Sequence, residues 1–359
     1  GAGAAGSYTL NWTTSNGVEY YQLQEKVDGG AWATTNQGLS TSRAFSGQAA
    51  GTYAYRVRAC NAEGCTGYST EQGLEVVYPP ASAPTLTAPA ASSTGAFSVT
   101  WNSVATATRY ELQQRKDGGS WSKIHDAAAR SKAVSSLANG SYGYRVRACN
   151  PGGCTAYSAT RTTVVTHPPT TAPALTAPAT NSTGGFTVTW TSVTSAARYE
   201  LQQRKDGGSW SKIHDAAARS KAVSSLANGS YGYRVRACNA GGCAAYSVIQ
   251  TTAVTHPPSG APTVTAPATN NNGSFTVTWT SVATATRYEL QQRKDDGGWS
   301  KIHDASSPSK AVSGLSSGSY DYRARACNAG GCATYSAIRT TVVTHPPTTA
   351  PALTAPAAS

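Results

Sequence analysis

Residues 139–150 read NGSYGYRVRACN, a turn followed by an alternating run. Asn139-Gly140 is a strong signal for a tight turn between antiparallel strands. From Tyr142 to Ala148, the residues Tyr, Tyr, Val and Ala occupy every second position, with Gly, Arg and Arg between them. This period of two is typical of a strand that packs one face against a core. The stretch therefore predicts a long β-strand that presents arginines to solvent.

A repeat with a period of 89 residues runs through the chain. Its cysteine and its tryptophan recur at Cys60, Cys149, Cys238 and Cys327, and at Trp12, Trp101, Trp190 and Trp279. The second and third copies share an identical run of 42 residues, 109–150 and 198–239, and the first copy is the most divergent. A period this long suits a small independent domain better than a solenoid repeat, which cannot bury a core alone. The 359 residues thus predict four copies of one domain.

Each copy is predicted to be all-β. In the second copy, residues 97–101, 110–114 and 121–124 carry strand signals, and residues 162–166 are rich in β-branched side chains. Turn sequences separate these runs, and no segment sustains a helical period of 3.6. About six or seven short strands at this spacing indicate a sandwich of two sheets.

Several residues of each copy follow one another in an order known from a protein family. In the second copy they are Trp101, Tyr110, Leu137, Tyr142, Asn150 and Ser158. This order resembles the fibronectin type III domain, and the resemblance covers the whole chain. It implies that the tryptophan lies on strand B and the first tyrosine on strand C, with the leucine and the second tyrosine framing the E–F turn. The first copy departs at Gln48, where the others have leucine, so its E–F corner is expected to be less tightly plugged.

The Cys-Asn-x-x-Gly-Cys motif after strand F resembles repeats of large bacterial secreted and surface proteins. The resemblance implies an extracellular or cell-surface protein of bacterial type and says nothing about a ligand. The predicted fold class is all-β, with four tandem immunoglobulin-like (fibronectin type III) sandwiches. The predicted domains are residues 1–78, 81–167, 170–256 and 259–345, followed at 346–359 by a linker and strand A of a further repeat. Proline-rich linkers between them favour semi-rigid spacing.

Strand A is expected to be missing from the first domain. The segment 84–89 is the predicted strand A of the second domain, and it recurs at 173–178, 262–267 and 351–356, whereas residues 1–6 lead directly into strand B. One interpretation is an excerpt from a longer array. The other is strand donation, in which the last copy of the segment completes the first domain of the next chain and builds head-to-tail filaments. The candidate donor residues are Pro351, Leu353, Thr354 and Pro356.

Each copy has two cysteines five positions apart, which predicts a disulfide across the loop between strands F and G. The pairs are Cys60 with Cys65, Cys149 with Cys154, Cys238 with Cys243, and Cys327 with Cys332. Metal binding is the alternative, but a structural zinc site usually needs four ligands and each copy supplies two cysteines. Paired cysteines indicate an oxidising, extracytoplasmic compartment.

No catalytic, cofactor-binding or metal-binding residue is predicted. His125, His214 and His303 each precede an aspartate, but the first copy lacks this pair and no Gly-x-Ser-x-Gly nucleophile motif accompanies it. Phosphate-binding glycine loops, His-Glu-x-x-His and calcium loops are also absent from the sequence. The chain is therefore expected not to be an enzyme and to need no cofactor.

Two sets of side chains are candidates for a ligand or partner surface. They are Arg145, Arg147, Arg234 and Arg236 on strand F, and Trp32, Trp121, Trp210 and Trp299 after glycine-rich turns. A structural role is favoured for both: glutamate–arginine pairs with Tyr157 stacked on them, and tryptophans that cover the sheet edge. The functional alternatives are a basic stripe that meets acidic polysaccharide, lipopolysaccharide or extracellular DNA without reading sequence, and tryptophans that stack on sugar rings.

Composition excludes several classes of protein. No run approaches 18 apolar residues, so no transmembrane segment is predicted. Eight Trp and 19 Tyr are too many for a disordered polar chain. We expect a stalk, fibre or filament subunit that associates with itself head to tail or continues a longer chain. The alternatives are an adhesin or carbohydrate-binding accessory region, with an acidic polysaccharide or cell-surface glycan as partner, and the shaft of a toxin-delivery or phage-tail protein. Sequence-specific nucleic-acid binding is not expected.

Overall fold

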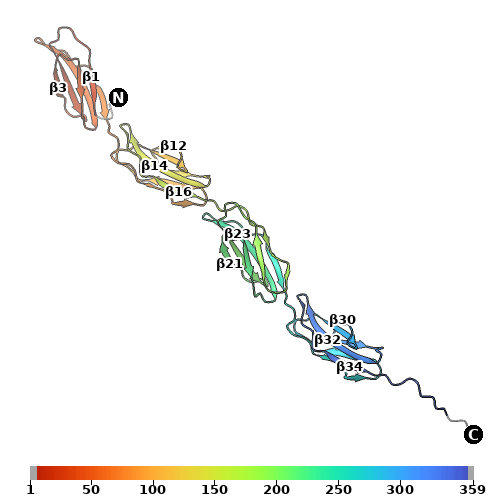
Figure 1. The fold of residues 1–359 in the computed structure, drawn as a ribbon. Helices are drawn as coiled ribbons and strands as arrows, with labels where there is room; N and C mark the ends of the chain where they lie inside the picture. Colours follow the sequence, from red (N-terminus) through yellow and green to blue (C-terminus); the bar gives the residue numbers. More distant parts are fainter. Residues whose placement is uncertain (1–5, 355–359) are drawn as a thin grey trace, which may run out of the picture. The chain divides into compact units, whose positions relative to one another are not determined.

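The computed structural model of the protein describes residues 6–354, and every regular element in that range is a β-strand. The chain divides into two compact units, Gly1–Pro168 with Ala240–Gly242, and Pro169–Asn239 with Cys243–Ser359. Each unit contains two sandwiches of facing sheets (Figure 1). Within residues 6–354 there is no helix that could cross a membrane.

The second sandwich shows the full arrangement of strands. They are β8 (Leu86–Thr87), β9 (Ala91–Ser92), β10 (Phe97–Trp101), β11 (Arg109–Lys116), β12 (Ser122–Ala127), β13 (Ser131–Val134), β14 (Gly140–Asn150), β15 (Gly153–Cys154) and β16 (Arg161–Val165). One sheet has the order β8-β10-β13 and the other β12-β11-β14-β16, with β9 parallel to β16 and β15 paired with β14. In family terms, strands A, B and E face strands C′, C, F and G. The predicted fibronectin type III-like fold class is thus confirmed.

The third and fourth sandwiches repeat this order. The third consists of β17 (Leu175–Thr176), β18 (Thr180–Asn181), β19 (Phe186–Trp190), β20 (Arg198–Lys205), β21 (Ser211–Ala216), β22 (Ser220–Val223), β23 (Gly229–Asn239), β24 (Gly242–Cys243) and β25 (Gln250–Val254). The fourth consists of β26 (Val264–Thr265), β27 (Thr269–Asn270), β28 (Phe275–Trp279), β29 (Arg287–Lys294), β30 (Ser300–Ala305), β31 (Ser309–Val312), β32 (Gly318–Asn328), β33 (Gly331–Cys332) and β34 (Arg339–Val343).

The core lies between the two sheets and follows from the alternation of the sequence. In the second sandwich, Leu112 of β11 lies opposite Val146 of β14, and both side chains are fully buried. Tyr144 is also buried, with the ring of Phe97 against it edge to face. The hydroxyl of Tyr142 donates a hydrogen bond of 3.0 Å to the Ala138 carbonyl and closes the E–F turn. Burial of each such aliphatic side chain stabilises the fold by about 1.5–3 kcal/mol.

The first sandwich has fewer strands than the others within residues 6–354. Its strands are β1 (Tyr8–Asn11), β2 (Tyr20–Val27), β3 (Ala33–Gly38), β4 (Ser42–Phe45), β5 (Gly51–Asn61), β6 (Gly64–Cys65) and β7 (Gln72–Val76). Within residues 6–354, β1 pairs with β4 alone, whereas β10 pairs with both β13 and β8. Its buried core is smaller and consists of Leu23, Phe45, Tyr53, Tyr55 and Val76. Leu137 packs against the core of the second sandwich, and its counterpart in the first is the polar, half-buried Gln48.

Candidate interaction surfaces

The outer face of strands C and F carries a row of paired arginines. In the second sandwich, Arg147 lies opposite Glu111, and Arg145 lies opposite Gln113. The Nε and Nη2 groups of Arg147 donate to the Glu111 carboxylate at 2.9 and 2.7 Å, and the Nε group of Arg145 donates to Gln113 at 2.8 Å. These arginines therefore face outward as expected, but their guanidinium groups have partners within their own sheet.

Aromatic rings interleave with these guanidinium groups. Arg145 lies 4.2 Å from the ring centroid of Trp121 and 4.3 Å from that of Tyr157, and Arg147 lies 4.8 Å from the ring of Tyr157. Each close cation–π contact contributes about 0.5–1 kcal/mol at an exposed site. We call this row the arginine–aromatic ladder. Its members in the other three sandwiches are Trp32, Arg56, Tyr68 and Arg58; Trp210, Arg234, Tyr246 and Arg236; and Trp299, Arg323, Tyr335 and Arg325.

The glutamate that pairs with the second arginine of the ladder, Glu111 in the second sandwich, is buried and ionised. Burial raises the pKa of the Glu111 carboxyl, but the hydrogen bonds from Arg109 and Arg147 outweigh it and leave the pKa below its usual value. Glu200 and Glu289 occupy the same place in the third and fourth sandwiches. Burial raises their pKa, but hydrogen bonds from a tyrosine hydroxyl and an arginine outweigh it and leave the pKa below its usual value. The first sandwich has the uncharged Gln22 there, whose side-chain oxygen accepts from Arg58 and Tyr68.

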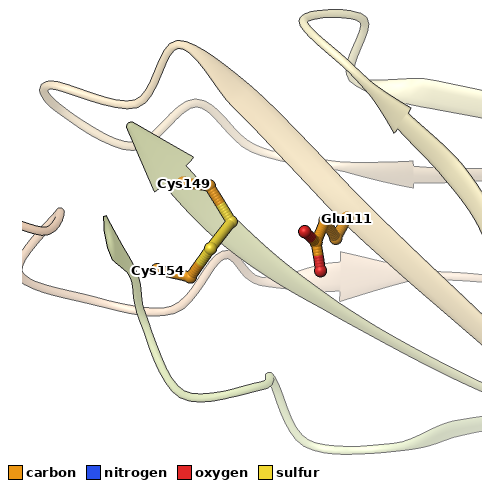
Figure 2. A group of neighbouring side chains, drawn as sticks. All are labelled: Glu111, Cys149 and Cys154. Atoms are coloured by element: carbon orange, nitrogen blue, oxygen red, sulfur yellow. A yellow bond between two sulfur atoms is a disulfide. The ribbon is translucent and has the colours of Figure 1, made fainter. Parts of the chain in front are cut away.

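The cysteines form the four disulfides expected from their spacing. Each joins cysteines five positions apart within one F–G hairpin, and all eight cysteines are paired. Figure 2 shows Cys149 and Cys154 joined in this way, with the Glu111 carboxylate beside them. Within residues 6–354 these three are the one cluster close enough to suggest a metal site. Both sulfurs belong to the disulfide, so neither offers the thiolate that a metal ion would need.

In the His-Asp sequences, the histidine and the aspartate have separate partners. His125 stacks edge to face on Trp101, with ring centroids 5.3 Å apart, and its Nε2 lies 3.1 Å from the Ala129 carbonyl oxygen. The neighbouring Asp126 accepts hydrogen bonds from Arg109 and Lys123 instead. His214 and His303 have the same surroundings.

The F–G hairpin of the second sandwich holds the linker that precedes that sandwich. The Nδ2 group of Asn150 donates to the Tyr78 carbonyl at 2.8 Å, and its Oδ1 accepts from the Gly152 amide at 2.9 Å. A Cβ atom at Gly152 would overlap the Val77 carbonyl oxygen, so only glycine lets the linker pass this closely. Sequence reasoning missed this role of the hairpin.

The same contacts recur in the other unit. Asn328 donates to the His256 carbonyl at 2.9 Å, and a Cβ atom at Gly330 would overlap the Thr255 carbonyl oxygen. In the first sandwich, the place of these glycines is taken by Glu63. Asn61 donates to the Gly17 carbonyl of its own sandwich, as Asn150 does to Thr106 and Asn328 to Thr284. The exchange of glycine for glutamate in the first copy is the sequence signal that could have revealed the contact.

A groove opens in the first sandwich where the others have strand A. It has a volume of about 420 Å³ and is lined by Trp12, by residues 66–70 and by residues of β1, β2 and β5, among them Leu10, Leu23 and Tyr55. The candidate donor residues within the described range are exposed. Leu353 is 97% exposed, Pro351 and Thr354 are exposed as well, and Pro356 lies outside the described residues.

Comparison with known proteins supplies no closer assignment. No protein-family model and no curated protein matches the chain. Among solved structures, the FN1–FN3 domains of chicken CNTN1 are similar to it, with 17% sequence identity and a TM-score of 0.33 over 74% of this chain and 99% of that one. A TM-score this low carries no functional argument. The tandem fold and the disulfides are those of an extracellular repeat array, and this conclusion rests on strand order and cysteine pairing.

Proposed function

We propose that this chain is a non-catalytic extracellular structural array, a stalk or filament subunit that holds what is attached to it at a set distance. The observation that carries the proposal is the hold of the F–G hairpin on the preceding linker. A flexible linker would let neighbouring domains reorient freely and would make a poor spacer. A linker bound through its backbone to the next domain restricts that freedom.

Three features combine to stiffen such a junction. The asparagine fixes a linker carbonyl, and the following glycine allows the close approach of the linker. The disulfide between Cys149 and Cys154 braces the hairpin that carries both residues. The linker then continues into Pro79-Pro80, whose rings restrict the backbone further.

The arrangement of the ladder also supports a structural role over ligand binding. Arg145 and Arg147 are engaged with carboxylate, amide and aromatic groups of their own sheet. An anionic ligand would have to replace these contacts. The same ladder occurs in all four sandwiches, which suits a spacer, since regular length matters more to a spacer than a distinctive site.

The spacer function can be tested by glycine substitutions with matched controls. Gly152→Ala and Gly330→Ala are expected to dislodge the linker, because the added methyl group meets a linker carbonyl. Gly67→Ala and Gly298→Ala are controls, since a Cβ atom there meets nothing within 4 Å. Small-angle scattering and negative-stain imaging should show a broader distribution of end-to-end distances for the first pair alone. Identical distributions for both pairs would remove the basis of the proposal.

A further inference from the structure

Two tyrosines of the first sandwich meet across its core with their hydroxyl groups in contact. Tyr8 lies on β1 and Tyr55 on β5, and these two strands belong to different sheets of the sandwich. The hydroxyl groups are hydrogen-bonded to each other, and the ring centroids lie 6.1 Å apart with an angle of 62° between the ring planes. Tyr55 is 3% exposed and Tyr8 is half-buried. The contact therefore joins one sheet to the other inside the sandwich.

A carboxylate completes this arrangement. Glu25 of β2 lies opposite Tyr55 in the sheet, and the Tyr55 hydroxyl donates a hydrogen bond of 2.5 Å to Glu25 Oε1. Because a hydroxyl group has one hydrogen to donate, Tyr8 donates to the Tyr55 oxygen. The hydrogen bonds thus run in one direction, from Tyr8 through Tyr55 to Glu25. A carboxylate within hydrogen-bond reach of a phenol is placed to take its proton.

The other three sandwiches differ at both of these positions. Phenylalanine replaces Tyr8 and packs edge to face on the strand F tyrosine, and glutamine replaces Glu25 and donates through its amide to that tyrosine. The three sets are Phe97, Tyr144 and Gln114; Phe186, Tyr233 and Gln203; and Phe275, Tyr322 and Gln292. Packing alone requires neither change in the first copy, since phenylalanine and glutamine fill the same places in three cores. The second phenol and the carboxylate therefore point to a chemical role.

Two phenols in contact beside a base are suited to oxidative coupling. Burial raises the pKa of the Tyr8 and Tyr55 hydroxyl groups, so each ring keeps its proton until it loses an electron and must then release it. Glu25 is the group placed to accept that proton. Two tyrosyl radicals couple through ring carbons next to the one that bears the hydroxyl. Contact between the hydroxyl groups brings these ortho carbons of the two rings near each other.

The rest of the chain leaves tyrosine open to oxidation. There is no methionine, and all eight cysteines are in disulfides, so neither sulfur side chain competes for a peroxide oxidant. Tyr8 is the member of the pair that solvent reaches more easily. Its counterparts Phe97, Phe186 and Phe275 are half-buried as well, although each lies in a sandwich that has a strand A.

We propose that Tyr8 and Tyr55 are a site of dityrosine formation, a carbon–carbon cross-link between the two sheets, with hydrogen peroxide as oxidant and a peroxidase as catalyst. Each ring gives up one electron and one proton, and together these reduce one peroxide molecule to two waters. The rings move closer than their present 6.1 Å and couple through one ortho carbon each. Each of these carbons then passes its hydrogen, as a proton, to the oxygen of its ring and so restores the phenol. The cross-link restricts the unfolded chain between residues distant in sequence and thereby stabilises the fold.

The test treats the full chain, with its disulfides intact, with peroxidase and hydrogen peroxide and maps the products by mass spectrometry. A peptide pair joined at Tyr8 and Tyr55, lighter by two hydrogens than the separate peptides, is expected, together with dityrosine fluorescence and a higher unfolding temperature. Tyr8→Phe should abolish this product and still fold, because phenylalanine occupies the position in the other three sandwiches. Glu25→Gln should slow the product severalfold. Absence of the joined peptides, in a reaction that couples added free tyrosine, would overturn the proposal.

A transfer variant tests whether this arrangement is sufficient for coupling. Phe97→Tyr with Gln114→Glu places the second phenol and the carboxylate beside Tyr144 in the second sandwich. It should create a cross-link between position 97 and Tyr144, and Phe97→Tyr alone is the matched control, expected to couple more slowly. Equal rates for the two variants would contradict the role given to Glu25. These changes leave the linker contacts of Gly152 and Gly330 in place, so the cross-link can fail while the spacer function stands.

Discussion

At the scale of single residues, the ladder shows how a buried charge is maintained on a sheet surface. The Glu111 side chain is 8% exposed and is bonded by Arg109 and Arg147, so its desolvation cost is offset by charge-assisted hydrogen bonds. The first sandwich reaches the same geometry with Gln22, which carries no charge. The chain therefore contains its own control for the contribution of this carboxylate.

The lowered pKa of Glu111, Glu200 and Glu289 makes stability depend on acid pH. Because the folded-state pKa is below the unfolded value of about 4.3, the contribution is complete above that pH and is lost as pH falls through the folded-state pKa. Calorimetry of the chain should show that the unfolding temperature falls as the pH is lowered from about 4.3 through the folded-state pKa. Replacement of all three glutamates by glutamine should make the fall shallower, whereas Gln22→Glu should make it steeper. An unchanged slope in the triple variant would contradict the assignment.

At the scale of structural elements, the F–G hairpin serves two purposes. It is the short turn that joins strand F to the chain returning along it, and it is the surface on which the preceding linker rests. The disulfide closes a loop of only a few residues, so its stabilisation comes from a small loss of unfolded-chain entropy. We expect its larger effect to be that it keeps the hairpin in the shape that supports the linker.

Removal of one disulfide should therefore distinguish its effect on the stability of a sandwich from its effect on the stiffness of the junction between sandwiches. Cys149→Ser with Cys154→Ser should lower the unfolding free energy of the second sandwich by about 2 kcal/mol. The same double change at Cys60 and Cys65 is the control, because no linker among the described residues rests on the first hairpin. Both variants should lose stability in denaturant titrations, but only the first should broaden the distances seen by small-angle scattering. Equal broadening in both would argue against the hairpin as the linker's support.

Strand β1 illustrates how one missing neighbour weakens an element. It has β4 as its partner in the described chain, and the core behind it is smaller than in the other sandwiches. Local opening costs least where buried contacts are few. Hydrogen exchange followed by mass spectrometry should find faster exchange in β1 than in its counterpart β28. Equal protection of the two strands would mean that the groove is already filled in solution.

At the scale of the whole molecule, the net charge of +12 is expected to favour attraction to polyanions without specifying a site. Such attraction is screened over about 8 Å at physiological salt. Because the ladder arginines are internally paired, they should contribute no more to it than exposed arginines do.

Retention on heparin resin tests this expectation. Arg145→Gln with Arg147→Gln should lower the salt concentration of elution no more than Arg130→Gln with Arg161→Gln, two exposed arginines of the same sandwich. Both pairs remove the same charge. A much larger effect of the ladder pair would instead support a functional basic stripe for an acidic polysaccharide.

The fold and the disulfides could be predicted because their signals are local or repeated. Alternation within residues 142–148 places Arg145 and Arg147 on the face opposite the core, and a hairpin turn brings Cys149 to Cys154. The period of 89 residues then carries each such inference through the chain. Neither step needs knowledge of which segments meet in space.

What could not be foreseen depends on segments distant in the sequence. Glycine is required at 152 only because the carbonyl of Val77 passes beside it. Trp121 stacks on Arg145 only because strands C and F are neighbours. The absence of a strand A motif before Trp12 is visible in the sequence, but the groove and the half-buried tryptophan are not. Pattern along a chain reports which face of a strand is apolar, whereas packing between distant segments determines which backbone groups meet and which apolar faces stay uncovered.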